Sequence, residues 1–168
     1  SGTYSITAGG TDHWGNRDNG SWIYDADGAR AAGSNFSAVV RSVSIAADPL
    51  EPLGNNWGRT GLMARQLPDE QGSPNVSHIR RDGNNAWTSL QGRKNLNQGT
   101  DRNGGEMGNG AQAAGNPFDR TRPFWLGLHR VDGAWYATWA VDNNGSPGTW
   151  SEPRKRNDSG NNMNGEVY

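Results

Sequence analysis

The sequence contains no cysteine among its 168 residues. That absence excludes disulfides, thiolate metal sites and cysteine nucleophiles together, so the fold must rest on packing and hydrogen bonds. Lysine is nearly absent as well, since it occurs only at Lys94 and Lys155, and the formal net charge is −1. A chain this close to neutral has no field that would gather nucleic acid or an anionic membrane surface, so we expect neither nucleic acid as a partner nor membrane insertion.

Long apolar runs are missing too. No segment approaches the roughly 20 consecutive apolar residues of a membrane helix, and no signal peptide is recognisable. No window sustains a 3.6-residue hydrophobic period without glycine or proline, so the sequence predicts no helix of any length. The chain begins at Ser1 without methionine. We therefore expect a processed product or a fragment of a longer polypeptide.

What the sequence does contain is aromatic residues and turn formers. Only 32% of the residues are hydrophobic, but eight of them are tryptophan. Each large aromatic side chain buries roughly 150–250 Å², so a few rings compensate for the sparse aliphatic content. Glycine (25 residues) and proline (8 residues) are abundant without a collagen-like period, as many turns between short strands require. A chain of this length fits one domain, and its composition predicts an all-β fold.

The clearest structural signal lies in residues 123–141. Two stretches of period-2 alternation flank Asp132-Gly133, a dipeptide that tolerates the positive φ angles of a type I′ turn. The segment therefore predicts an antiparallel hairpin. On its first arm, positions 124, 126 and 128 share one face and positions 125, 127 and 129 share the other, so one face can be core and the other a rim or platform.

Further segments alternate in the same way and are expected to be strands. They are residues 3–7, 21–25, 36–46, 59–65, 75–81 and 86–93. We expect 36–46 to pair with 59–65, and 75–81 to pair with 86–93 through a turn at Asp82-Gly83. Roughly eight or nine strands at regular spacing predict one β-sandwich domain spanning residues 1–168, built from two antiparallel sheets, rather than an α/β domain.

Residues 94–116 form a long polar segment rich in glycine and asparagine. Structureless loops of this length are uncommon inside compact domains, and they are usually functional or mobile. The sequence leaves two interpretations open, a solvated insertion and an ordered binding loop.

Several segments together resemble a known family. They are Asp12-His13-Trp14-Gly15, residues 36–44, residues 57–65 (WGRTGLMAR) and residues 124–130 (FWLGLHR). In these segments the chain is similar to concanavalin A-like, laminin-G-like jelly-roll domains of the DUF1349 type, which occur in secreted and surface proteins of bacteria, and the match spans nearly the whole chain. The resemblance implies a two-sheet antiparallel jelly-roll sandwich, an extracellular or cell-surface location, and recognition as the usual role.

The sequence departs from that family pattern at its end. In the family, a segment like residues 165–168 (GEVY) leads into a further apolar strand, whereas here the sequence stops at Tyr168. Two explanations stay open. Either the sequence is a truncated piece, or the domain lacks its last strand and leaves an edge that another chain fills by strand addition. The second explanation predicts a structural subunit of a surface or filament assembly.

Motifs of the common catalytic sites are absent. Jelly-roll glycosidases carry two carboxylates about 5 to 9 Å apart, commonly from alternate positions of one strand, and the sequence has no such pair. The histidines, His13, His78 and His129, lack zinc-site spacing, and there is no G-x-S-x-G segment. We therefore expect no catalytic residues. A glycoside-active enzyme with two loop-borne acids is the less favoured alternative.

Some acidic turns offer the oxygen ligands that calcium prefers. They are Asp25-x-Asp27-Gly28, Asp101-x-Asn103-Gly104 and residues 142–145. None completes an EF-hand loop, and aspartate and asparagine are also favoured in turns for local hydrogen bonding alone. Calcium thus stays an open candidate cofactor, with Asp25 and Asp27 as its best ligands.

The aromatic residues are the richest functional signal. Sugars present apolar C–H faces that stack on exposed rings, so tryptophans near loops are candidate ligand-binding residues. Four qualify, namely Trp14, Trp57, Trp87 and Trp150. Core packing is the competing role for each ring, because the interior needs aromatic volume. The sequence therefore predicts a non-catalytic, extracellular recognition module whose partner is a glycan or other copies of the same chain.

Overall fold

The structure, a computed structural model, describes residues 5, 23, 30, 31, 33–45, 59–66, 72–81, 88–100, 106–107, 122–156, 163 and 167. Within these residues the chain forms nine β-strands and no helix. The strands are β1 (Phe36–Ser42), β2 (Arg59–Arg65), β3 (Asn75–Arg81), β4 (Thr88–Arg93), β5 (Glu106–Met107), β6 (Phe124–Val131), β7 (Ala134–Asn143), β8 (Ser146–Trp150) and β9 (Arg154–Lys155). None of the described segments forms an apolar helix of membrane-spanning length.

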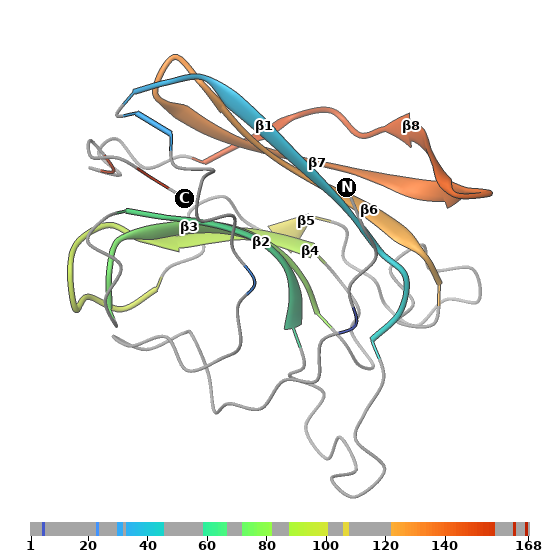
Figure 1. Ribbon diagram of the computed structural model, residues 1–168, viewed down its shortest axis with the longest axis horizontal. Helices are drawn as coiled ribbons and strands as arrows, with labels where there is room; N and C mark the ends of the chain where they lie inside the picture. Colours follow the sequence, from blue (N-terminus) through green and yellow to red (C-terminus); the bar gives the residue numbers. More distant parts are fainter. Residues whose placement is uncertain are drawn as a thin grey trace, which may run out of the picture.

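The strands form two antiparallel sheets that pack as two layers (Figure 1). In the five-stranded sheet the order is β1-β6-β7-β8, and β9 pairs with β7. The other sheet has the order β2-β3-β4-β5. The prediction of an all-β, two-sheet antiparallel sandwich is therefore confirmed for the described part of the chain.

The predicted hairpin is present as β6 and β7. Its register pairs Phe124 with Val141 at one end and Val131 with Ala134 at the other. Asp132 and Gly133 both have positive φ angles, 48° and 77°, as a type I′ turn requires. A second turn of this kind, at Asn144-Gly145 with φ angles of 51° and 90°, joins β7 to β8.

The partner predicted for segment 36–46 is wrong. The strand in this segment, β1, pairs with β6, whereas β2 pairs with β3 in the other sheet. Successive strands are usually neighbours in a sheet, but the connection between β1 and β2 is long enough to cross from one layer to the other. The alternation of apolar residues predicted the two strands, and it carries no information on their partners.

The other predicted strands divide into two groups. β3 and β4 pair antiparallel as expected, and the turn at Asp82-Gly83 lies outside the described residues. The segments 3–7 and 21–25 also lie outside them, except for single positions. Segment 94–116, predicted as a long polar loop, contains the short strand β5, which pairs with the beginning of β4.

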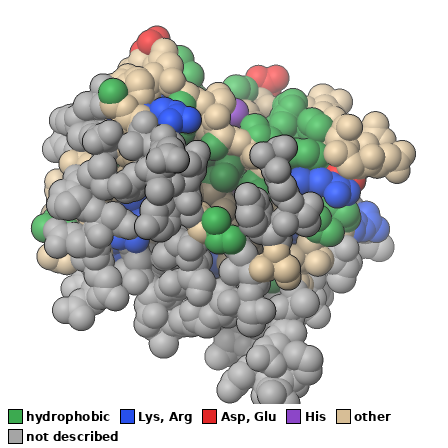
Figure 2. Space-filling view, viewed as in Figure 1, with side chains coloured by type: hydrophobic (Ala, Val, Ile, Leu, Met, Phe, Trp, Pro, Cys, Tyr) green, Lys and Arg blue, Asp and Glu red, His purple; other side chains and the backbone are tan. Residues whose placement is uncertain are grey.

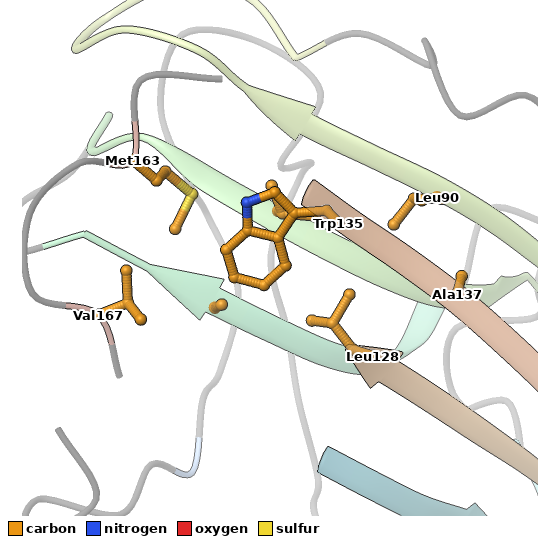
Figure 3. Packing of buried hydrophobic residues seen from close by; sticks show 8 residues of the cluster. Leu90, Leu128, Trp135, Ala137, Met163 and Val167 are labelled. Atoms are coloured by element: carbon orange, nitrogen blue, oxygen red, sulfur yellow. The ribbon is translucent and has the colours of Figure 1, made fainter. Parts of the chain in front are cut away.

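Apolar side chains from both sheets fill the space between the layers (Figure 3). The buried cluster consists of Ala64, Val76, Leu90, Leu128, Trp135, Ala137, Met163 and Val167. Aromatic rings extend it. Phe36 packs edge-on against Trp135 with ring centroids 5.5 Å apart, and Phe124 stacks on Trp139 at 5.6 Å. These rings supply the volume that the sparse aliphatic content lacks.

Val167, near the C-terminus, lies beside the four-stranded sheet. Val167 forms single-residue bridges with Arg30 on one side and with Gln66, just beyond β2, on the other. Its backbone exchanges hydrogen bonds of 3.0 and 2.7 Å with Arg30, and its side chain is fully buried. The chain itself therefore occupies the position beside Gln66. Along β2, no described strand pairs on the side away from β3.

Candidate ligand-binding face

The outward-pointing side chains of the five-stranded sheet form one surface, called the outer face below. Alternation along β6 separates it from the core, because Phe124, Leu126 and Leu128 are buried while Trp125 and His129 are only half-buried. The predicted division of this arm into a core face and a platform is thus confirmed. Register assigns to the outer face Ser37, Val39, Arg41, Trp125, Gly127, His129, Tyr136, Thr138, Ala140, Asp142 and Trp150. Figure 2 shows hydrophobic side chains gathered over this layer.

Two tryptophans flank a small residue in one cross-strand row. Arg41, Trp125, Ala140 and Trp150 lie opposite one another on β1, β6, β7 and β8. Side chains directly opposite each other have Cβ atoms about 4.5–5.5 Å apart. Ala140 is fully buried on this outer face, as expected when large rings on both sides cover its methyl group. Trp150 is 36% exposed, so solvent reaches its ring.

Asp142 fixes this row through its carboxylate. Oδ1 accepts hydrogen bonds from Arg41 Nε at 2.6 Å and from Trp125 Nε1 at 2.8 Å. Oδ2 accepts from Arg41 Nη2 at 2.9 Å and from the backbone N–H of Gly145 at 3.1 Å. A carboxylate has about four acceptor positions, so this one is fully used. The indole of Trp125 is consequently held in one orientation.

The Arg41–Asp142 pair stays ionised. The Arg41 hydrogen bond is the main reason that the pKa of Asp142 lies well below its usual value, and the N–H groups of Gly145 and Trp125 act in the same direction. Desolvation opposes this shift. The same hydrogen bond raises the pKa of Arg41. The two charges cancel, so this part of the outer face carries no net charge.

Of the three turns predicted as calcium-site candidates, the structure describes one. The turn 142–145 has one carboxylate, Asp142, and protein donors occupy its oxygens, which makes this turn unsuited to a cation. Asp25, Asp27 and the turn 101–104 lie outside the described residues. Within the part of the chain that the structure describes, no three histidine, cysteine, aspartate or glutamate residues are grouped as a metal site.

His129 connects three strands of the outer face. Its Nδ1 lies 2.9 Å from Ser37 Oγ on β1, and its Nε2 lies 2.8 Å from Thr138 Oγ1 on β7. Burial lowers the pKa of His129. Gly127 makes room for this arrangement, because a Cβ at this position would lie 2.5 Å from Thr138 Oγ1 and 2.6 Å from His129 Nε2. The half-buried centre of the face is therefore tied together by polar contacts.

Only one of the four predicted aromatic site residues is described. Trp150 lies in the row opposite Ala140, whereas Trp14, Trp57 and Trp87 lie outside the described residues. Sequence reasoning missed Trp125 as a candidate site residue. The signal was present, because an aromatic residue between the buried Phe124 and Leu126 must face outward in a strand.

Comparisons with protein-family models, with curated proteins and with solved structures give no match. The resemblance to the DUF1349-type jelly-roll domains therefore remains a prediction from the sequence.

Proposed function

We propose that the protein is a non-catalytic recognition module that binds an uncharged carbohydrate on the outer face. The observation that carries this proposal is the row in which Trp125 and Trp150 flank Ala140. The two rings belong to strands two positions apart, which separates them by roughly 10 Å. Sugar rings stack their C–H faces on aromatic side chains. The side chain of Ala140 between the two tryptophans is small and does not protrude from the face.

Preorganisation supports the proposal. A ring that is already fixed loses little conformational entropy when a ligand binds, and Asp142 fixes Trp125 before any ligand arrives. Arg41 adds a polar contact beside the rings. Two of its three guanidinium nitrogens bind Asp142, and its side chain is 33% exposed, so Nη1 is available to donate to a sugar hydroxyl.

The charge balance favours a neutral ligand. Asp142 offsets the charge of Arg41. The carboxylate oxygens of Asp142 already accept their full set of hydrogen bonds, and their negative charge would repel an acidic sugar. An extracellular or cell-surface location belongs to the same proposal, and the resemblance to secreted jelly-roll domains supports it. The non-catalytic assignment rests on the absence of catalytic motifs in the sequence.

A glycan array followed by tryptophan fluorescence titration tests the function. We expect neutral oligosaccharides to bind, and Trp150→Ala to weaken binding about tenfold or more by removing the stacking surface. Thr149→Ala changes an exposed neighbour on the same strand and should bind as the parent does. Absence of any neutral ligand, or equal affinity in the Trp150→Ala variant, would contradict the proposal.

A second candidate function is a structural subunit joined by strand addition, and one observation favours it. β2 has no described partner on the side away from β3, and Gly61 in its middle is exposed. Such edges accept strands of other chains. The backbone N–H of Gln66 donates to the carbonyl oxygen of Pro74 and so points to the β3 side of the strand. Because backbone N–H groups alternate in direction along a strand, that of Met63, three residues earlier, points away from β3. If β2 mediates assembly, Met63→Pro should abolish oligomers seen by light scattering at high concentration. A monomer at every concentration would exclude this function.

A further inference from the structure

The buried charges of the described residues are all positive. Four arginines are at most 4% exposed, and no aspartate or glutamate is buried among the residues whose side-chain burial the structure describes. The four are Arg80, Arg93, Arg130 and Arg156. A guanidinium taken out of water needs acceptors for its N–H groups, because desolvation costs several kcal/mol per ion. Arg80 and Arg93 donate to backbone carbonyls from several nitrogens.

Arg130 differs from Arg80 and Arg93 in its hydrogen bonding. Its Nη2 donates to the carbonyl oxygen of Met163 at 2.9 Å, whereas Nε and Nη1 are buried and have no acceptor among the described residues. Its guanidinium carbon lies 5.5 Å from the ring centre of Trp135. The indole Nε1 of Trp135 is likewise buried without an acceptor, and this residue is 3% exposed. Within the part of the chain that the structure describes, three buried donor nitrogens on two neighbouring residues thus lack an acceptor.

These donors lie in one small region. Arg130 and Trp135 are directly opposite each other on β6 and β7, and both face the interior. Figure 3 shows the indole nitrogen on the side of the ring that faces Met163, whose carbonyl oxygen binds Arg130. Arg156 is next in the row, since its backbone N–H donates to the carbonyl of Trp135 at 2.9 Å. Arg156 has partners of its own and adds its positive charge to the region.

We propose that Arg130 and Trp135 form a binding site for a chloride ion. The site offers donors and an excess of positive charge, and Trp135 belongs to the same buried apolar cluster as Met163, Val167 and Leu128. A monatomic anion accepts N–H donors from any direction. A sulfate or phosphate would bring further oxygen atoms. These oxygens would need hydrogen-bond donors, which the neighbouring apolar side chains do not provide. Arg130 and Trp135 lie close to the Asp132-Gly133 turn, so the site is at the hairpin end of the sandwich.

Halide-dependent stability tests the site independently of carbohydrate binding. Chloride replaces gluconate at constant ionic strength, from about 1 to about 100 mM, and the melting temperature is recorded. Since a bound ligand stabilises the folded state by mass action, we expect a rise of about 5 °C. Crystals grown in bromide should show an anomalous peak within hydrogen-bonding distance of the Arg130 guanidinium and Trp135 Nε1.

Two variants separate the site from general salt effects. Trp135→Phe keeps an aromatic ring beneath the guanidinium and removes one donor. About tenfold more chloride or more should then be needed for the same rise in melting temperature. Lys155→Gln removes an exposed charge and should leave the response unchanged. Equal melting temperatures in chloride and gluconate, no bromide peak, or an undiminished response in Trp135→Phe would each overturn the proposal.

Discussion

Arg41 of β1 and Asp142 of β7 form an ion pair across the full width of β6, with Arg41 Nε 2.6 Å from Asp142 Oδ1 and Nη2 2.9 Å from Oδ2. Trp125 lies on the strand between them and donates to the same carboxylate. The pair therefore joins three strands and positions one ring of the proposed carbohydrate site. A defect at Asp142 should affect the sheet and the binding face together.

The first prediction concerns this pair directly. Asp142→Asn removes the charge and part of the acceptor capacity, so Arg41 and Trp125 lose their partner. Because the pair is partly exposed, we expect a modest fall in melting temperature of a few degrees. The fluorescence of Trp125 should shift as its indole N–H is released. Asp132→Asn, in the exposed hairpin turn, is the matched control and should leave fluorescence unchanged.

The second prediction is loss of stability in acid through Asp142. Its pKa is lower in the folded protein than in the unfolded chain, so the unfolded chain takes up the proton first as the pH falls. The contribution is complete above the unfolded pKa of about 3.9 and declines at lower pH. In urea midpoints measured from pH 6 to pH 2, this contribution should appear as an additional loss of stability below about pH 4. The fall should be smaller in Asp142→Asn, and equal slopes in both proteins would contradict the assignment.

The third prediction concerns His78, which is fully buried. Burial lowers its pKa to about 4, although its Nδ1 contacts the carbonyl oxygen of Gly127 at 2.9 Å. The unfolded chain binds this proton near pH 6.5, so stability falls as the pH drops from about 6.5 to about 4. At about 1.4 kcal/mol per pKa unit, the loss is about 3 kcal/mol.

An NMR titration of the imidazole checks the His78 prediction. The ring should stay neutral until the pH approaches 4, whereas the more exposed His129 should titrate at higher pH. A His78 resonance that titrates near 6.5 in the folded protein would contradict the burial of this side chain. In the variant His78→Gln, unfolding free energy should lose most of its pH dependence in that window.

The fourth prediction tests the packing between the sheets. Leu128 is 1% exposed and lies in the buried cluster, so Leu128→Ala should destabilise the fold by about 2–5 kcal/mol through lost burial and a residual cavity. Val39→Ala, at a position 47% exposed on the outer face, should change the unfolding free energy by no more than about 0.5 kcal/mol. Urea denaturation of both variants measures the difference. Equal effects would place Leu128 outside the core.

Much of the local structure of the site was predictable from the sequence. Alternation around Asp132-Gly133 predicts the hairpin, its turn and the outward direction of Trp125, because successive side chains of a strand point to opposite faces. Trp150 was a predicted site residue, and the structure places it in the same row. By contrast, nothing in the local pattern links Arg41 with Asp142, which are 101 positions apart in the chain.

The sequence alone determined where β1, β2, β3, β4, β6 and β7 lie and which side of β6 enters the core, since these depend on residues a few positions apart. It did not predict the strands β5, β8 and β9. Only the tertiary structure decided that β1 pairs with β6 and that Arg130 is buried beside Trp135. It also decided that the Asp142 carboxylate accepts hydrogen bonds from Arg41 and Trp125. Strand partners and the surroundings of a charge depend on how distant segments share one interior. That outcome follows from the free energy of packing the whole chain, which no local pattern encodes.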